Sequence, residues 1–300
     1  MSYKKILVTG GTGTVGKHLQ KLIPYGTFIG RSHEHGGDLR DSQYVKWLIS
    51  SYTPDVVVHL AAKVGGIQEN IQKPAEFFDD NILMNTNVLK YSHQYGVKQF
   101  IGILSTCIYP DKVSNYPMTE QDLFLGPPTP TNFSYGYAKR TLAVQIDAYN
   151  QQYGTKYNYL IPCNLYSEYD NFDNENKMHF ITALLHKIKN SKGVVELLGD
   201  GTPLRQFMYA GDLAQVIKEV IDNNITDSFN VAPPENLSID QMAKISLKTL
   251  GLNLKINYSN PKLNGQFRKD VSSAKLNSIL PNFNFTPFKQ GIKKVYDKIS

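Results

Sequence analysis

A tyrosine and a lysine four residues apart, Tyr135 and Lys139, have the spacing in this sequence that most directly indicates proton chemistry. The surrounding pattern is helical, so the two side chains should share one helix face, one turn apart. A nearby ammonium favours the phenolate, and we therefore predict a lowered pKa for Tyr135, toward values at which it can exchange a proton. The spacing also arises by chance in a chain with 19 tyrosines, so its weight depends on its surroundings.

Glycines at positions 10, 13 and 16 lie between an expected strand, Ile6–Val8, and an expected helix. Glycine permits a tight turn, lets the backbone approach a pyrophosphate, and allows a helix to pack closely on a strand. The helix N-terminus adds N–H donors and the positive end of its dipole. We predict a dinucleotide-binding turn made of Gly10, Gly11, Thr12, Gly13, Thr14, Val15 and Gly16.

Arg31 follows the second expected strand, Thr27–Gly30. In an NAD protein an acidic residue here bonds the ribose 2′-hydroxyl, whereas an arginine suits the 2′-phosphate of NADP. The sequence therefore predicts NADP(H) rather than NAD. His33 and His35 are interpreted as surface histidines, and no metal site is predicted.

These residues must be positioned by strands that alternate with helices along the first half of the chain. Expected strands lie at 6–8, 27–30, 55–60, 99–104 and 157–163, and expected helices at 15–23, 44–51, 77–95 and 135–153. This alternation is typical of a parallel sheet covered on both faces. The predicted fold class is α/β, a doubly wound parallel-sheet Rossmann fold with a smaller α/β C-terminal substrate-binding domain.

The polar stretch Ser167–Asn176 lacks periodicity and is predicted to be a loop at a domain boundary. Beyond it we expect helices at 180–189, 239–250 and from 289, and a strand at 255–258. We assign 1–166 and 207–231 to the cofactor domain, and 167–206 and 232–300 to the substrate domain.

Composition excludes several classes of protein. Two cysteines in 300 residues cannot form a disulfide scaffold or a structural zinc site, which favours a reducing, cytoplasmic compartment. The net charge of +6 is spread along the chain, so no nucleic-acid partner is predicted. No segment approaches the roughly 18 consecutive apolar residues of a membrane helix, and the chain begins without a signal-peptide pattern, so we expect a soluble protein with no membrane partner.

The glycine turn, Ser105-Thr106 and the Tyr135/Lys139 pair together resemble the extended short-chain dehydrogenase/reductase superfamily. Further stretches resemble its GDP-L-fucose synthase branch, and they cover almost the whole chain. These stretches are His59–Gly66, Leu104–Pro110, Tyr135–Lys139, Ile161–Asn164, Asp170–Phe172 with His179, Arg205–Phe207 with Asp212–Ala214, Gly265–Lys269 and Phe285–Lys289.

The resemblance implies 3,5-epimerisation of GDP-4-keto-6-deoxy-D-mannose followed by NADPH-dependent reduction at C4. Cys107 would be the base that removes the C3 and C5 protons, and His179 the acid that reprotonates the opposite face. Tyr135 would give the proton in the reduction, Lys139 would hold the nicotinamide ribose, and Ser105 would polarise the carbonyl. From residue type alone, Cys107 is interpreted instead as a small buried hydrophobe and His179 as an ordinary packing or surface histidine.

The resemblance also implies contacts to both nucleotides. Cofactor contacts beyond the turn are expected from Arg31, Asp38, Leu39, Leu60, Ala61, Ala62, Tyr135, Lys139, Pro162, Asn164, Leu165 and His179. Substrate contacts are expected from Ser105, Thr106, Cys107, Asn164, Lys187, Leu198, Arg205 and Lys269. The second cysteine, Cys163, is expected to face the core. A homodimer through the helices at 77–95 and 135–153 is a further expectation.

Two departures from the branch concern nucleotide contacts. Leu198 stands where bacterial relatives have a tryptophan, which leaves a stacking contact to guanine in doubt, and Thr12 replaces an arginine of some relatives. Two alternatives remain open: a single-function NADPH-dependent 4-ketoreductase of another GDP-6-deoxy sugar or heptose, and, more remotely, a non-catalytic NADPH sensor.

Overall fold

The computed structural model describes residues 4–30, 36–172, 178–260 and 266–299. Within these ranges a parallel six-stranded sheet has the order β10-β5-β4-β3-β1-β2. Its strands are β1 (Ile6–Thr9), β2 (Thr27–Ile29), β3 (Val56–His59), β4 (Gln99–Ile103), β5 (Asn158–Pro162) and β10 (Phe229–Val231). The four inner strands are fully buried, as expected where both faces of a sheet are covered. The predicted doubly wound α/β fold is confirmed.

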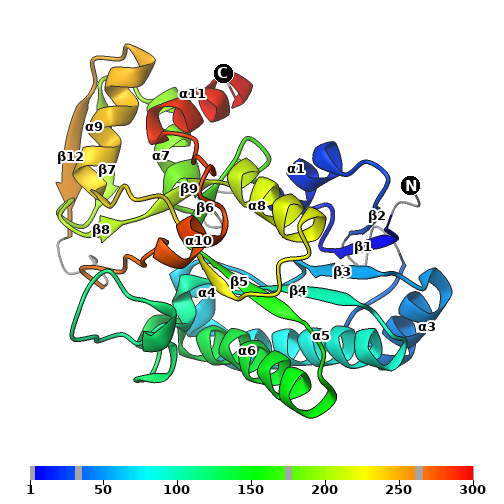
Figure 1. Cartoon of the computed structure of the whole chain (residues 1–300). Helices are drawn as coiled ribbons and strands as arrows, with labels where there is room; N and C mark the ends of the chain where they lie inside the picture. Colours follow the sequence, from blue (N-terminus) through cyan, green and yellow to red (C-terminus); the bar gives the residue numbers. More distant parts are fainter. Residues whose placement is uncertain (1–3, 31–35, 173–177, 261–265, 300) are drawn as a thin grey trace.

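Helices cover both faces of this sheet (Figure 1). On one face α1 packs against α8, and on the other α5 packs against α6 and α3. Their bounds are α1 (Thr14–Leu22), α8 (Ala210–Asp222), α3 (Ser42–Tyr52), α5 (Pro74–Gln94) and α6 (Phe133–Tyr153). None of the helices in the described ranges combines the length and apolar character that a membrane crossing requires.

A second, smaller hydrophobic cluster lies beside the sheet, built mainly by α7, α9 and α11 with short strand pairs. The helices are α7 (Phe180–Asn190), α9 (Ile239–Leu250) and α11 (Phe288–Ile299). The paired strands are β6 (Asn164–Tyr166) with β9 (Phe207–Tyr209), β7 (Val194–Leu198) with β12 (Lys255–Ser259), and β8 (Leu204–Arg205) with β11 (Leu237–Ser238). Val271 and Leu276, by contrast, pack in the first cluster, so the late part of the chain reaches back to the sheet. The domain limits given above stay a prediction.

Most predicted elements are present within a few residues of their expected bounds. The expected strand at 157–163 is different: it ends at Pro162, and β6 begins after Cys163 and pairs with β9 outside the central sheet. Short elements escaped the periodicity argument because they span too few residues. They are α4 (Ile67–Gln72), α10 (Ala274–Ile279) and the 3-10 helices η1 (Thr106–Ile108), η2 (Glu120–Phe124) and η3 (Pro130–Asn132).

The glycine turn joins β1 to α1 by close backbone contacts. The Gly11 amide donates to the Ile29 carbonyl at 2.8 Å, and Gly10 has a φ of 72°, which favours glycine. A Cβ at Gly16 would lie 2.2 Å from the Gly11 carbonyl oxygen. The third glycine therefore sets how closely the helix approaches the turn.

Replacing Gly16 with alanine should separate α1 from the turn. We expect Gly16→Ala to lower the free energy of unfolding by about 1–3 kcal/mol, because the added methyl meets rigid backbone. Gly13→Ala is the matched control, since its Cβ would meet only the Gly10 oxygen, at 3.2 Å. Urea denaturation measures both, and equal losses would contradict the packing argument.

Candidate active site

The carboxyl ends of the parallel strands bring the predicted site residues to one edge of the sheet. Ser105 follows β4 and caps η1, where its Oγ accepts from the Cys107 amide at 3.3 Å. Thr106 within η1 is buried. Leu60, Ala61 and Ala62 follow β3, and the backbone of Ala61 lies directly against Gly10. The turn, η1 and the start of α6 therefore converge, as open α/β sheets place their ligands.

Lys139 is buried beneath this edge, with only 2% of its surface exposed. Its Nζ donates to the Ile103 carbonyl at the end of β4, at 2.8 Å. Burial lowers the pKa of Lys139 to about 8, because an ammonium without an ionic partner is disfavoured away from water.

A buried histidine, His59 of β3, links α6, the helix of Lys139, to the central sheet. His59 contacts Thr9 Oγ1 through Nδ1 at 2.7 Å and Asn85 Oδ1 through Nε2 at 3.0 Å. Asn85 in turn donates to the Ala138 carbonyl at 3.4 Å. Burial, and then the charge of Lys139, lowers the pKa of His59 to about 3, so it is neutral and holds the helix as a hydrogen-bonding bridge.

The predicted lowering of the Tyr135 pKa is wrong. Burial raises the pKa of Tyr135, and the negative charge of the nearby Cys107 sulfur raises it further. The Lys139 ammonium, which donates to the Ile103 carbonyl, does not offset this rise. Tyr135 is therefore a protonated phenol, suited to give a proton rather than to wait as a phenolate.

Cys107 is partly exposed and has polar partners, unlike a core cysteine. Asn132 Nδ2 lies 3.3 Å and Lys269 Nζ 3.2 Å from its Sγ. Burial raises its pKa, but the Lys269 charge and the hydrogen bonds from Ser105, Lys269 and Asn132 outweigh burial and hold the pKa below its ordinary value. Sequence reasoning missed Asn132, although a polar residue just before the Tyr135 helix was a possible signal.

The second cysteine behaves differently. Cys163 is buried in the first cluster, which confirms the expectation that it faces the core. Burial raises its pKa well above the ordinary range. Asn164, next to it, donates to the Gln206 carbonyl at 3.0 Å, and Leu165 pairs with Met208 in the neighbouring strand.

The predicted substrate residues are spread over several elements, and not all reach Cys107. Arg205 in β8 interacts electrostatically with Cys107. Burial lowers the pKa of Arg205, and the negative charge of Cys107 partly opposes this change. Its Nη1 donates to the Leu204 carbonyl at 2.7 Å. Lys187 on α7 instead donates to the Glu196 carbonyl at 2.8 Å, and Leu198 at the end of β7 is exposed. His179 is the N-cap residue of α7.

A carboxylate connects the glycine turn to the helix that His179 caps. Asp170 accepts from Thr14 Oγ1 at 2.9 Å and from Thr182 Oγ1 at 2.8 Å. Burial raises the pKa of Asp170, while the bonds from Thr182, Thr14 and the Ser167 amide oppose the rise. The sequence quoted Asp170 within a motif without giving it this role, because Thr14 is 156 residues away.

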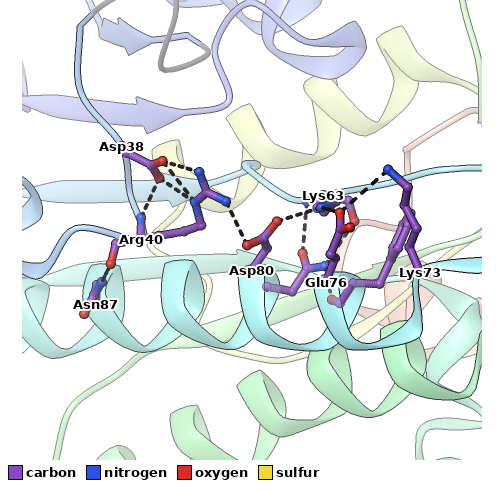
Figure 2. Close-up of polar contacts among 9 residues, drawn as sticks. Asp38, Arg40, Lys63, Lys73, Glu76, Asp80 and Asn87 are labelled. Atoms are coloured by element: carbon purple, nitrogen blue, oxygen red, sulfur yellow. Dashed lines mark hydrogen bonds and ion pairs between the residues drawn. The ribbon is translucent and has the colours of Figure 1, made fainter.

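The loops after β2 and β3 are tied to α5 by the charged network of Figure 2. Arg40 Nη1 bonds Asp80 at 2.9 Å and its Nε bonds both Asp38 oxygens, while Lys63 Nζ bonds Asp80 at 2.8 Å and Glu76 at 2.7 Å. Leu39, between Asp38 and Arg40, is buried. Arg31 lies outside the described residues, so its predicted contact has no structural account.

Comparison with known proteins gives consistent matches. A family described as the NAD dependent epimerase/dehydratase family matches residues 6–232. A GDP-L-fucose synthase of Dictyostelium discoideum is 36% identical, covering 98% of this chain and 94% of its own. A GDP-L-colitose synthase of Yersinia pseudotuberculosis is 33% identical over 97% and 96% of the two chains. The crystal structure of a GDP-L-fucose synthetase from Naegleria fowleri bound to NADP superposes with a TM-score of 0.89 at 34% identity, over 100% of this chain and 93% of that one.

The buried charge of Lys139 should make stability depend on pH. Its folded pKa of about 8 lies below the value of about 10.4 for an unfolded lysine, so between these values the unfolded chain binds more protons and stability rises with pH. We expect the free energy of unfolding of the wild type to rise relative to Lys139→Met across that window. The difference should stay constant below about pH 7. Parallel curves over the whole range, in denaturant titrations at each pH, would contradict the burial argument.

Proposed function

Because this chain belongs to the NAD dependent epimerase/dehydratase family, we propose that it makes GDP-L-fucose from GDP-4-keto-6-deoxy-D-mannose, with NADPH as reductant. The names of the relatives that match nearly full length support this reading. The observation that carries it is the pairing of two kinds of acid-base group at one edge. A thiol with a depressed pKa, Cys107, lies beside a protonated phenol, Tyr135.

The turn fits the pyrophosphate of a dinucleotide. Gly13 caps α1 without a side chain that occupies the helix N-terminus, and the first turn of α1 has no acidic residue. Its N–H groups are therefore available to an anion. When bound, NADPH supplies the hydride for C4. We propose that residues 10–16 hold the pyrophosphate, that Arg31 binds the 2′-phosphate, and that Asp38, Leu39 and Leu60–Ala62 line the adenosine side.

The first stage requires a base for two carbon acids. The C3 and C5 protons are acidic because each carbon flanks the C4 carbonyl. The Cys107 thiolate takes the proton, the electron pair moves into the C4–O group as an enolate, and His179 returns a proton on the opposite face. In this proposal Ser105 donates to the C4 oxygen, and its position just after β4, at the start of η1, supports this role.

The second stage requires an acid. As hydride reaches C4, the oxygen becomes an alkoxide, and Tyr135 gives it a proton. The raised pKa of Tyr135 keeps this proton available at neutral pH. Lys139 holds the nicotinamide ribose in this proposal, with Pro162, Asn164 and Leu165 along the nicotinamide. Lys187, Leu198, Arg205 and Lys269 are proposed to face the GDP-sugar.

Replacing Tyr135 and Cys107 one at a time should separate epimerisation from reduction. We expect Tyr135→Phe to reduce ketone reduction by at least about 100-fold while C3 and C5 protons still exchange, because general acid catalysis contributes about 10²–10⁴-fold. Cys107→Ser should do the reverse and block epimerisation. Incubation of GDP-4-keto-6-deoxymannose in heavy water without NADPH measures exchange, and product identification with NADPH measures the whole reaction.

Cys163→Ser is the matched control and should leave both stages intact, because that thiol faces the core. Absence of exchange in the wild type, with reduction intact, would replace the proposal by a single-function 4-ketoreductase. Equal loss of both stages in both variants, with the fold retained, would contradict the division of labour.

We further propose a homodimer through α5 and α6. These helices pack against each other on one face of the sheet (Figure 1) and expose large apolar side chains. Phe78 and Leu83 of α5 are 38% and 46% exposed, and Val144 and Tyr153 of α6 are each 50% exposed. The cytoplasmic location expected from the sequence stays a prediction.

Sedimentation velocity tests this dimer. The double variant Leu83→Glu/Val144→Glu should sediment as a monomer, because two carboxylates per subunit would be placed in the interface. Val194→Glu, an apolar residue on β7 with 43% exposure, is the control and should stay dimeric. A wild-type monomer would refute the proposed interface.

A further inference from the structure

The sulfur of Cys107 lies between two donors from distant parts of the chain. Asn132 ends η3, immediately before α6, and Lys269 follows β12 in sequence, 162 residues from Cys107. An ammonium has donors and no acceptor, and the Asn132 contact is made through its amide nitrogen. Both contacts therefore require the sulfur to accept, which a thiolate does far better than a thiol.

The backbone that follows Lys269 is anchored by hydrogen bonds to two other segments of the chain. The Met118 amide donates to the Asp270 carbonyl at 2.9 Å, and the Ser272 amide returns a bond to Met118 at 2.7 Å. Gln206 holds the amide and carbonyl of Val271, at 2.9 and 3.1 Å. The backbone next to Lys269 is thus held to Met118 and Gln206, and from it the Lys269 side chain reaches the Cys107 sulfur.

The neighbouring acid does not neutralise the ammonium. Asp270 is buried and is bound by Arg268 through Nε at 2.5 Å and Nη2 at 2.9 Å. Among the contacts of the described residues, the polar partner of Lys269 Nζ is the Cys107 sulfur, and no carboxylate contacts that sulfur. The Lys269 charge is therefore available to the thiolate.

The other ionisable groups near the Cys107 sulfur either stabilise the thiolate or carry no charge. Arg205 adds a second positive charge, and its guanidinium is held by the carbonyls of Leu204 and Phe267. Tyr135 is neutral at working pH because burial and the sulfur's own charge raise its pKa. The surroundings of Cys107 are thus electropositive, the condition under which cysteine becomes reactive.

We propose that Lys269 and Asn132 are positioning residues that hold Cys107 as a thiolate, so that the carbon base is assembled only where the C-terminal segment docks on the sheet. This inference rests on the proposed function for its chemical use. It gives Lys269 a second role, in addition to the contact with the GDP-sugar proposed above.

The two proton removals explain why an ammonium belongs there. The C–H electron pair is delocalised into the C4–O group as the enolate forms, and the proton becomes the S–H proton of Cys107. Before the second carbon reacts, that proton must leave for water, because the sulfur can hold only one. An ammonium 3.2 Å from the sulfur favours the loss, so the base is reset within one turnover.

Alkylation of the full-length protein tests the thiolate without any turnover. The rate of iodoacetamide labelling at Cys107, followed by mass spectrometry from pH 5 to 10, reports the thiolate fraction. The inflection of the wild-type profile should lie below the ordinary thiol value of about 8.5. Lys269→Met should move the inflection upward by at least one pH unit, which is about a tenfold slower reaction at pH values below both inflections.

Four further variants sharpen the result. Lys269→Arg retains the charge and should keep the low inflection, and Asn132→Ala should give a smaller upward shift. Lys275→Met is the matched control on α10, since its ammonium bonds the Ser228 carbonyl instead, and its profile should equal the wild type. Cys107→Ser removes the label, which shows that Cys163 does not contribute.

An unmoved labelling profile in Lys269→Met would overturn the inference, and a raised KM alone would then assign Lys269 to substrate binding. If Lys269→Met fails to fold, Asn132→Ala provides the test, because it retains the lysine. An unchanged labelling profile in Asn132→Ala would contradict the proposal that Asn132 and Lys269 together hold the thiolate. Failure of the proposed function shows elsewhere, as absence of GDP-L-fucose from the wild type, and does not alter the labelling profile.

Discussion

The ammonium of Lys139 is a full charge placed where water does not reach, and it is bonded to the carbonyl that ends β4. That bond fixes the start of α6 against the edge of the sheet. The same strand end continues directly into Ser105 and η1, so the phenol of Tyr135 and the sulfur of Cys107 take their positions from one junction. The neutral His59, bonded to Thr9 and Asn85, supports α6 from behind. The positions of Tyr135 and Cys107 therefore depend on Lys139, a cationic residue that is costly to bury.

One environment drives the two acid-base groups in opposite directions. Burial alone would raise the pKa of both Tyr135 and Cys107. The pKa of Cys107 is nevertheless lowered, because hydrogen-bond donors and a positive charge surround its sulfur. The negative charge of that sulfur then raises the pKa of Tyr135 further. The positive charges near Cys107 thus leave a base, Cys107, beside an acid, Tyr135. This arrangement is expected where two proton transfers follow one another.

The sequence predicted well what is local and poorly what depends on distance along the chain. The glycine turn and the long helices were visible because their signals lie within a few residues. The raised pKa of Tyr135 was not, because the orientation of Lys139 depends on where β4 ends. Neither was the contact of Lys269 with Cys107, nor the Thr14–Asp170–Thr182 bridge, because only the folded chain brings these groups together. Family resemblance supplied candidate residues, but it named partners for Lys269 other than the one the fold provides.

The order of strands in the sheet has a consequence for synthesis. Strand β10, which pairs with β5, follows β5 in the chain only after α7, β7 and α8 have been made. During translation the five preceding strands can assemble while the outer side of β5 remains an open edge, the kind of surface that pairs with other chains. Asn158 and Tyr159 lie on this strand, and their later bonds to Asp227 and Ser228 close it together with β10. The nascent chain is therefore most exposed to misassembly while the residues between β5 and β10 are still being synthesised.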